Sequence, residues 1–239
     1  MRLTGGAILL LSAAAAAQSP GDQIIPAVTY PTLPRQAAAL EHFVPAGWKL
    51  EAKAAGDLNG DSLPDAALVL HMDSARNRIA PSFAPDTRYD TNPRMLVVLL
   101  GRKGGGYALA AADHKLIPRY ENPNMDDPFD EIGIARGVLS VKMHARYEAG
   151  GYRDGTAAFR FRVQGGAVRL IGYDGDWQVR PTGETELVSV NYPARRMTLM
   201  KGSMSGDAPD KTDTVTLPNK PLLTLDQIGD GLMFDPDEH

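Results

Sequence analysis

Apolar and polar residues alternate with a period of two along much of the second half of the chain. Over 138–147 the two kinds of side chain fall on opposite faces of an extended strand. The apolar face has Leu139, Val141, Met143, Ala145 and Tyr147, and the polar face has Ser140, Lys142, His144 and Arg146. The segment 156–163 alternates in the same way, with Phe159 and Phe161 on its apolar face. This pattern is typical of antiparallel strands that bury one face.

The connections between these segments predict a meander. Residues 148–155 are rich in turn formers, and Gln164-Gly165-Gly166-Ala167 is a tight hairpin signal that leads into 168–173. The run 95–100 is apolar on both faces, which predicts a central strand. Further strands are expected at 66–72, 107–111, 186–191 and 197–201. The fold is therefore predicted to be mainly β, with antiparallel meander sheets in a sandwich or a partial-propeller-like arrangement.

Outside these strands the sequence predicts little regular structure. Residues 18–35 contain four prolines and are expected to form an extended lead-in. Gln36–Phe43 predicts one short N-terminal helix, which a Pro-Ala-Gly sequence ends. Long loops are expected at 73–93 and 117–128. Because composition shows no break and no segment repeats, residues 36–239 are predicted to form a single β-rich domain.

Residues 1–17 have the features of an export signal. Arg2 precedes an apolar run that begins at Ala7, and small residues at Ala15 and Ala17 fit a cleavage site before Gln18. The alternative is a short membrane anchor, but the run is below the ~18 to 20 apolar residues that span a bilayer. We therefore expect a cleaved signal peptide and no transmembrane segment after cleavage.

The chain has 239 residues and no cysteine, which bears on both location and chemistry. Small exported eukaryotic domains use disulfides to compensate for limited cores, so a cysteine-free exported chain fits a bacterial periplasmic or extracellular protein better. The lack of cysteine also excludes thiolate catalysis, thiolate zinc sites and iron–sulfur clusters. The formal net charge of −4, without a basic cluster, argues against a nucleic-acid partner.

The strongest chemical signal is the loop Asp57-Leu58-Asn59-Gly60-Asp61-Ser62-Leu63-Pro64-Asp65. Calcium prefers about six to eight oxygen ligands, and alternate positions of a tightly wound loop can converge on one ion. The expected ligands are four side chains and one backbone carbonyl, from Asp57, Asn59, Asp61, Asp65 and, through its carbonyl, Leu63. Gly60 permits the sharp turn between them. The alternative is a polar turn held by Asx hydrogen bonds, with no ion.

This loop differs from an EF-hand and resembles the calcium loops of another family. An EF-hand needs a bidentate Glu at position 12, where this chain has Leu68. Because the loop leads into a strand, the segment Trp48–Leu70 resembles the loops of FG-GAP and VCBS-type repeats, as in integrin α-subunit propellers. The resemblance implies calcium ligation by the four side chains named above. Those propellers repeat the loop, whereas this chain has one copy and resembles exported bacterial proteins with a single such loop. The resemblance thus implies a site and no particular activity.

A second acidic group lies at 126–131, where Asp126, Asp127, Asp130 and Glu131 cluster. Such a run is most often a solvated loop, in which case these residues are dispensable for folding. The alternatives are a second metal site or an exported hydrolase that uses two of the carboxylates. A pocket that holds two of them together with His71 or Arg119 would favour the hydrolase.

The remaining candidates are weaker. No two histidines have a zinc-protease spacing, and neither a serine-nucleophile motif nor a phosphate loop is present. His144, on the polar face of its strand, is expected to be exposed, and His71 is the one histidine worth examining as a general base. The sequence therefore favours a non-catalytic, calcium-binding exported β protein that acts as a binding or interaction module for a protein or glycan. Calcium would stabilise it because only the folded chain forms the site.

Overall fold

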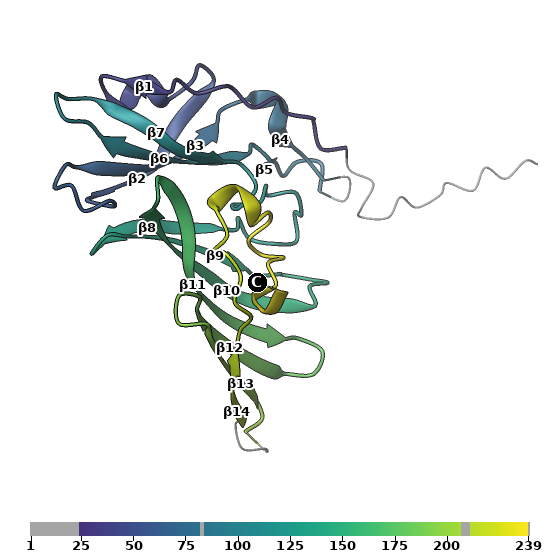
Figure 1. The fold of residues 1–239 in the computed structure, drawn as a ribbon. Coiled ribbons are helices and arrows are strands. Elements are labelled where there is room, and N and C mark those ends of the chain that lie inside the picture. The colour runs from purple at the N-terminus through teal and green to yellow at the C-terminus, as the bar shows by residue number, and fades with distance from the viewer. Residues whose placement is uncertain (1–23, 82–83, 207–210, 239) are drawn as a thin grey trace, which may run out of the picture.

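The computed structural model describes residues 24–81, 84–206 and 211–238, so the predicted signal peptide lies outside the described residues. Its strands form one antiparallel sheet of five strands, one of seven and a small hairpin, which confirms the mainly β prediction (Figure 1). The five-stranded sheet has the order β1 (Gln36–Ala37), β7 (Tyr107–Asp113), β6 (Arg94–Gly101), β3 (Asp65–Met72) and β2 (Trp48–Gly56). The hairpin pairs β4 (Arg78–Ile79) with β5 (Tyr89–Asp90).

The seven-stranded sheet is an uninterrupted meander. Its strands follow one another in space as they do in the chain: β8 (Phe129–Ala135), β9 (Val138–Ala145), β10 (Arg153–Gln164), β11 (Ala167–Val179), β12 (Glu184–Asn191), β13 (Arg196–Ser203) and β14 (Lys211–Thr216). The predicted hairpins between 138 and 173 are present, because β9, β10 and β11 pair consecutively. Alternation within each strand gives this sheet an apolar inner face and a largely polar outer face.

The inner strands β3 and β6 of the five-stranded sheet are buried on both faces, whereas the edge strand β2 is largely exposed. On one face Leu68 and Val97 pack against Phe43 of the N-terminal segment. On the other face Val69 and Leu96 join the core of the seven-stranded sheet. The run 95–100 lies within β6, which has β3 and β7 on either side, so the predicted central strand is confirmed.

The C-terminal segment crosses the inner face of the seven-stranded sheet, as the yellow chain in Figure 1 shows. Its Phe234 ring lies 5.3 Å from that of Phe159 and 5.5 Å from that of Tyr173, measured between centroids. The backbone N–H of Gly231 donates to the carbonyl of Leu116 at 3.0 Å. This segment therefore covers apolar strand surface that the five-stranded sheet leaves free.

The predicted N-terminal helix is shorter than the sequence pattern suggests. Of Gln36–Phe43, only Leu40–Phe43 forms a turn of 3₁₀ helix, η1, and Gln36–Ala37 pairs with β7 as β1. Pairing with the sheet edge satisfies backbone groups there, so tertiary contacts override the local helix preference of the alanines. The other 3₁₀ turns are η2 (Ala75–Asn77), η3 (Leu225–Gln227) and η4 (Pro236–Glu238). No helix among the described residues is long and apolar enough to cross a membrane.

Candidate functional sites

The predicted calcium loop joins β2 to β3 and is held by its own side chains. Asp57 accepts hydrogen bonds from the backbone N–H groups of Gly60 at 2.7 Å and Ser62 at 2.9 Å. Asn59 and Asp61 each accept from the N–H two residues further along, at 3.0 and 2.8 Å. Gly60 has a φ of +81°, the left-handed conformation that this tight winding requires. The three side chains at alternate positions are thus oriented by the loop backbone.

Asp65, the last predicted ligand, lies inside the protein at 1% exposure. One carboxylate oxygen accepts from the N–H of Leu58 at 2.7 Å and the other from the N–H of Gly101 at 2.8 Å. Each carboxylate oxygen has two lone pairs, so each keeps one that these bonds do not use. Asp65 therefore fixes the loop to the end of β6 and retains acceptor capacity.

The carboxylates of the loop repel one another. Burial raises the pKa of Asp65; the N–H groups of its two partners oppose that effect, and the negative charges of Asp61 and Asp57 add to it. The pKa of Asp57 is lowered, chiefly by the N–H of Ser62. A cation beside these groups would relieve the repulsion.

The donor set suits calcium by its chemistry. All five predicted ligands offer oxygen, the donor that a hard cation prefers. Among the described residues, no three Asp, Glu or His side chains gather closely enough to hold a metal ion by themselves. A site here would therefore also need the amide oxygen of Asn59 and the carbonyl of Leu63.

The loop lies at the junction of the two sheets. A Cβ atom added to Gly56, at the end of β2, would come within 2.5 Å of the side chain of Ile134 in β8. A Cβ atom on Gly101, at the end of β6, would come within 2.6 Å of the carbonyl oxygen of Pro64. Both approaches leave no room for a side chain, so the loop is packed between β6 and the edge strand of the other sheet.

The expectation of a solvated loop holds only in part for the acidic run 126–131. Asp126, Asp130 and Glu131 are exposed, but residues 129–131 belong to strand β8 and Asp127 is paired with a buried cation. The carboxylate of Asp127 binds the guanidinium of Arg94 through two hydrogen bonds of 2.7 and 2.8 Å. Glu51 binds the same guanidinium through two more, of 2.6 and 2.8 Å. Arg94 is only 4% exposed, so its charge depends on these partners. Because Glu51 and Arg94 belong to the five-stranded sheet and Asp127 precedes β8, this network ties the two sheets together.

A β-bulge places Glu51 in this network. The pairing of β2 with β3 skips one residue between Leu50 and Ala52, and that residue is Glu51. Bulges redirect a side chain relative to its neighbours. His71 lies beside it, with Nδ1 3.5 Å from the Glu51 carboxylate and Nε2 3.1 Å from the carbonyl of Asn92. His71 is buried at 6% exposure and uses both ring nitrogens in these contacts, which is typical of a structural histidine.

A second bulge brings Asp130 to His144. The pairing of β8 with β9 skips Asp130, whose carboxylate lies 2.6 Å from His144 Nδ1. His144 is 8% exposed, so the prediction that it is exposed is wrong. Its Nε2 atom is buried with no hydrogen-bond partner among the described residues. Glu131 binds the exposed Lys142 at 2.5 Å.

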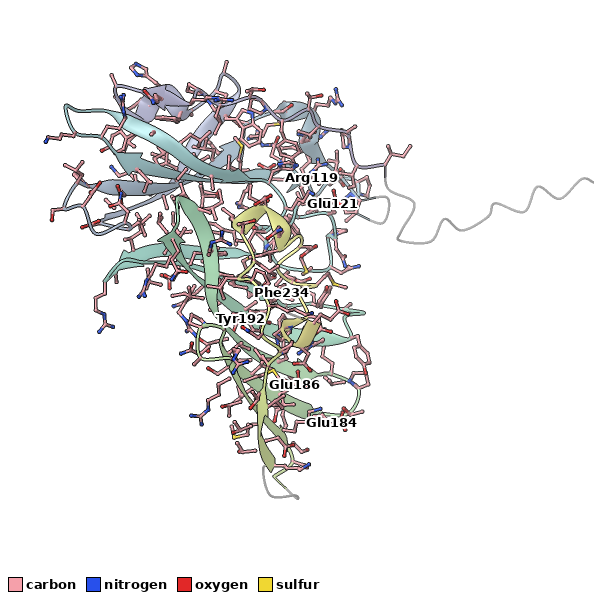
Figure 2. The ribbon with its side chains drawn as sticks, in the orientation of Figure 1. Arg119, Glu121, Glu184, Glu186, Tyr192 and Phe234 are labelled. Atoms are coloured by element: carbon pink, nitrogen blue, oxygen red, sulfur yellow. The ribbon has the colours of Figure 1, made fainter. Side chains whose placement is uncertain are left out.

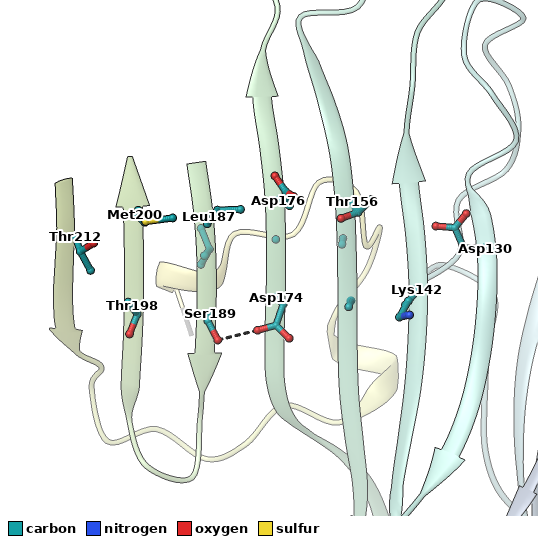
Figure 3. A pocket seen from close by; sticks show the side chains of 14 residues that line it. Asp130, Lys142, Thr156, Asp174, Asp176, Leu187, Ser189, Thr198, Met200 and Thr212 are labelled. Atoms are coloured by element: carbon teal, nitrogen blue, oxygen red, sulfur yellow. Dashed lines mark hydrogen bonds between the residues drawn. The ribbon is translucent and has the colours of Figure 1, made fainter. Parts of the chain in front are cut away.

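The carboxylates of 126–131 are therefore directed to different partners. A hollow of about 580 Å³ on the outer face of the seven-stranded sheet is lined by Asp130, Lys142 and Thr156, together with Asp174 and Ser189, and by none of the other three acids (Figure 3). The dashed line in Figure 3 joins Ser189 to Asp174 at 2.7 Å. Arg119 lies elsewhere and donates to the carbonyl of Thr91 at 2.8 Å.

A cleft that the sequence pattern did not reveal lies on the inner face of the same sheet. It has a volume of about 600 Å³, and its wall includes Tyr173, Trp177 and Phe234, with Glu186 at its edge. Figure 2 labels Phe234 on the C-terminal segment and Glu186 on β12. The residues that line the cleft lie between positions 145 and 237 of the chain. In the sequence, only the aromatic residues on the strand faces could have indicated it.

No family model, curated protein sequence or solved structure matches this chain in the comparisons with known proteins. The function must therefore be argued from the geometry of these sites.

Proposed function

We propose that this chain is an exported calcium-binding β protein that acts as a non-catalytic binding or interaction module. The observation that supports this best is the β2–β3 loop, where Asp57, Asn59 and Asp61 are oriented by backbone N–H groups and Asp65 lies behind them. Its partner would be a protein or a glycan, and its location the periplasm or the outside of a bacterial cell.

Calcium in this loop would act on the junction between the sheets. The ion would supply positive charge beside three carboxylates that repel one another. The loop packs against β8 through Gly56 and against β6 through Pro64, so an ordered loop would restrain both sheets. Because the unfolded chain cannot assemble the ligands, binding would add directly to the free energy of unfolding.

The hydrolase alternative has less support. Its one favourable observation is the Asp130–His144 pair, in which a carboxylate orients a histidine ring as in general-base catalysis. However, His144 Nε2 is covered, and Asp127 is bound to Arg94 rather than facing Asp130. The carboxylates therefore do not form the facing pair that glycoside hydrolysis uses.

Thermal unfolding in EDTA and in millimolar calcium tests the proposal. We expect calcium to raise the melting temperature, with a gain in unfolding free energy of ~2.7 kcal/mol at a hundredfold excess over Kd. Asp61→Ala should abolish this gain and raise the melting temperature in EDTA, since it removes one of the repelling charges. Magnesium should stabilise the protein less, because it demands a rigid octahedral site.

Asp126→Ala is the matched control, because Asp126 is exposed and its loss changes the net charge by the same amount. This variant should keep the full calcium-dependent gain. Identical melting of the unmodified protein in EDTA and in calcium would contradict the proposal and leave a polar turn. An equal loss of the gain in Asp126→Ala would show that calcium acts only through general charge.

A further inference from the structure

The cleft on the inner face of the seven-stranded sheet has the size and lining of a ligand site. Its volume of about 600 Å³ falls within the ~300–1,000 Å³ of small-molecule sites. Five aromatic side chains line it, Tyr147, Tyr152, Tyr173, Trp177 and Phe234. No residue of the five-stranded sheet is among those that line it. The C-terminal segment 232–237 forms its other wall.

Two glycines make room for the Trp177 ring. A Cβ atom on Gly155 would lie 2.7 Å from the indole, and one on Gly175 would lie 2.6 Å from its Nε1 atom. The indole N–H donates to the hydroxyl of Tyr173 at 3.3 Å, which holds the ring in place. The guanidinium of Arg153 lies 4.3 Å from the centre of the ring, a cation–π contact. The cleft therefore already holds one organic cation, supplied by the protein itself.

The remaining charges of the cleft are not balanced. The two cations that line the cleft, Arg153 and Lys201, both pair with Glu186, at 3.0 and 3.7 Å. Asp235 and Asp237 also line the cleft and are exposed, and neither forms an ion pair with a described Lys or Arg. Burial and the negative charges of Asp235 and Glu186 raise the pKa of Asp237 against the opposing effect of Lys201. Asp235 accepts one hydrogen bond, from the backbone N–H of Asp237 at 3.0 Å. An anion would thus find both cations of the cleft already paired, whereas a cation would find two carboxylates that no described Lys or Arg neutralises.

A buried hydroxyl near the same place has no hydrogen-bond partner. Tyr192 is 8% exposed, and its hydroxyl is buried with no partner among the described residues. Tyr192 does not itself line the cleft but borders a smaller pocket beside it, with Leu170 and Leu217. Burial raises the pKa of Tyr192 most, and Tyr173, Asp237 and Asp235, which line the cleft, add to this rise. Unpaired buried polar groups are uncommon and often mark a site that a ligand or water completes.

We propose that this cleft binds a small linear organic cation, of the polyamine class, whose alkyl chain packs on the aromatic side chains while its ammonium groups pair with Asp235 and Asp237. The inference rests on the binding role proposed above and names a ligand for it. Its site is separate from the calcium loop. Aromatic faces attract ammonium groups, and carboxylates at the rim select for positive charge.

Tryptophan fluorescence tests this directly, because the chain has only two tryptophans. In Trp48→Phe the remaining Trp177 reports on the cleft, and spermidine should change its emission saturably. Calorimetric titration of the unmodified protein should give the same Kd. Asp235→Asn/Asp237→Asn should weaken spermidine binding by about tenfold, since two ion pairs are lost. Glu184→Gln/Asp226→Asn removes the same charge from exposed positions that do not line the cleft, and should leave Kd unchanged.

Three results would overturn the inference: no saturable binding of spermidine, equal weakening in both double variants, or binding of neutral cellobiose in its place. The titrations are run in EDTA and again in calcium. If calcium fails to raise the melting temperature but spermidine still binds, only the calcium proposal fails. If calcium stabilises the protein and spermidine does not bind, only the cleft is misassigned.

Discussion

The two sheets differ in how they are covered. In the five-stranded sheet, β3 and β6 have apolar side chains on both faces, and both faces are buried. In the seven-stranded sheet one face carries the core and the other carries polar residues over a hollow, and its edge strand β14 is exposed along its whole length. The comparison teaches that the smaller sheet serves mainly as a buried support, whereas the larger one offers surface on which a ligand can bind.

The largest loss of stability is expected when the ion-pair network of Arg94, which joins the two sheets, is broken. Arg94→Ala should lower the free energy of unfolding by about 3–5 kcal/mol, because it leaves Glu51 and Asp127 facing each other without their shared cation. Chemical denaturation measures the change. Glu131→Ala is the control from the same acidic run: its ion pair with Lys142 is exposed, so it should cost about 0.5 kcal/mol or less. Equal losses in the two variants would contradict the network's role.

Acid should weaken the same junction. Burial alone would raise the pKa of Glu51, but its hydrogen bonds with Arg94 and His71 outweigh burial and lower the pKa to about 2. A carboxylate with a lowered pKa stabilises the folded protein above its ordinary pKa, and that stabilisation is lost as the pH falls towards 2. We expect the unmodified protein to lose up to about 3 kcal/mol more than Glu51→Gln between pH 5 and pH 2. Urea unfolding at several pH values measures this, and parallel curves would contradict it.

Replacing one valine in each sheet by alanine compares the burial of the two sheets, and these substitutions are expected to have the smallest effects on stability. Val97 in β6 is fully buried, whereas Val215 in β14 is 40% exposed. Val97→Ala should cost about 2 kcal/mol, because it removes buried methyl groups and leaves a cavity. Val215→Ala should cost about 0.5 kcal/mol or less. Melting curves of the two variants supply the measurement, and similar losses would show that the sheets are equally buried.

Local patterns in the sequence were enough to predict much of the fold. Alternation over 138–147 and 156–163 identifies β9 and β10 and their inner faces, and a doubly apolar run identifies β6. The winding of the loop 57–65 could also be predicted from the sequence, because its hydrogen bonds join residues within a few positions of one another. Strands β2, β8 and β14 were not predicted. A bulge interrupts the pattern in β2 and in β8, and β14 is exposed along its length, so no apolar face marks it.

The sequence by itself thus determined most of the strands, the faces they bury and the local winding of one loop, all of which depend on neighbours along the chain. Tertiary structure alone decided the partners of the acidic run, since Asp127 meets Arg94 across 33 positions and Asp130 meets His144 through a bulge. It also decided the cleft, whose walls come from β9–β13 and the distant C-terminal segment. The physical reason is that the position of a residue in the alternating pattern shows which face of the strand its side chain occupies. Whether a charge on that face is buried depends on which distant segment covers it.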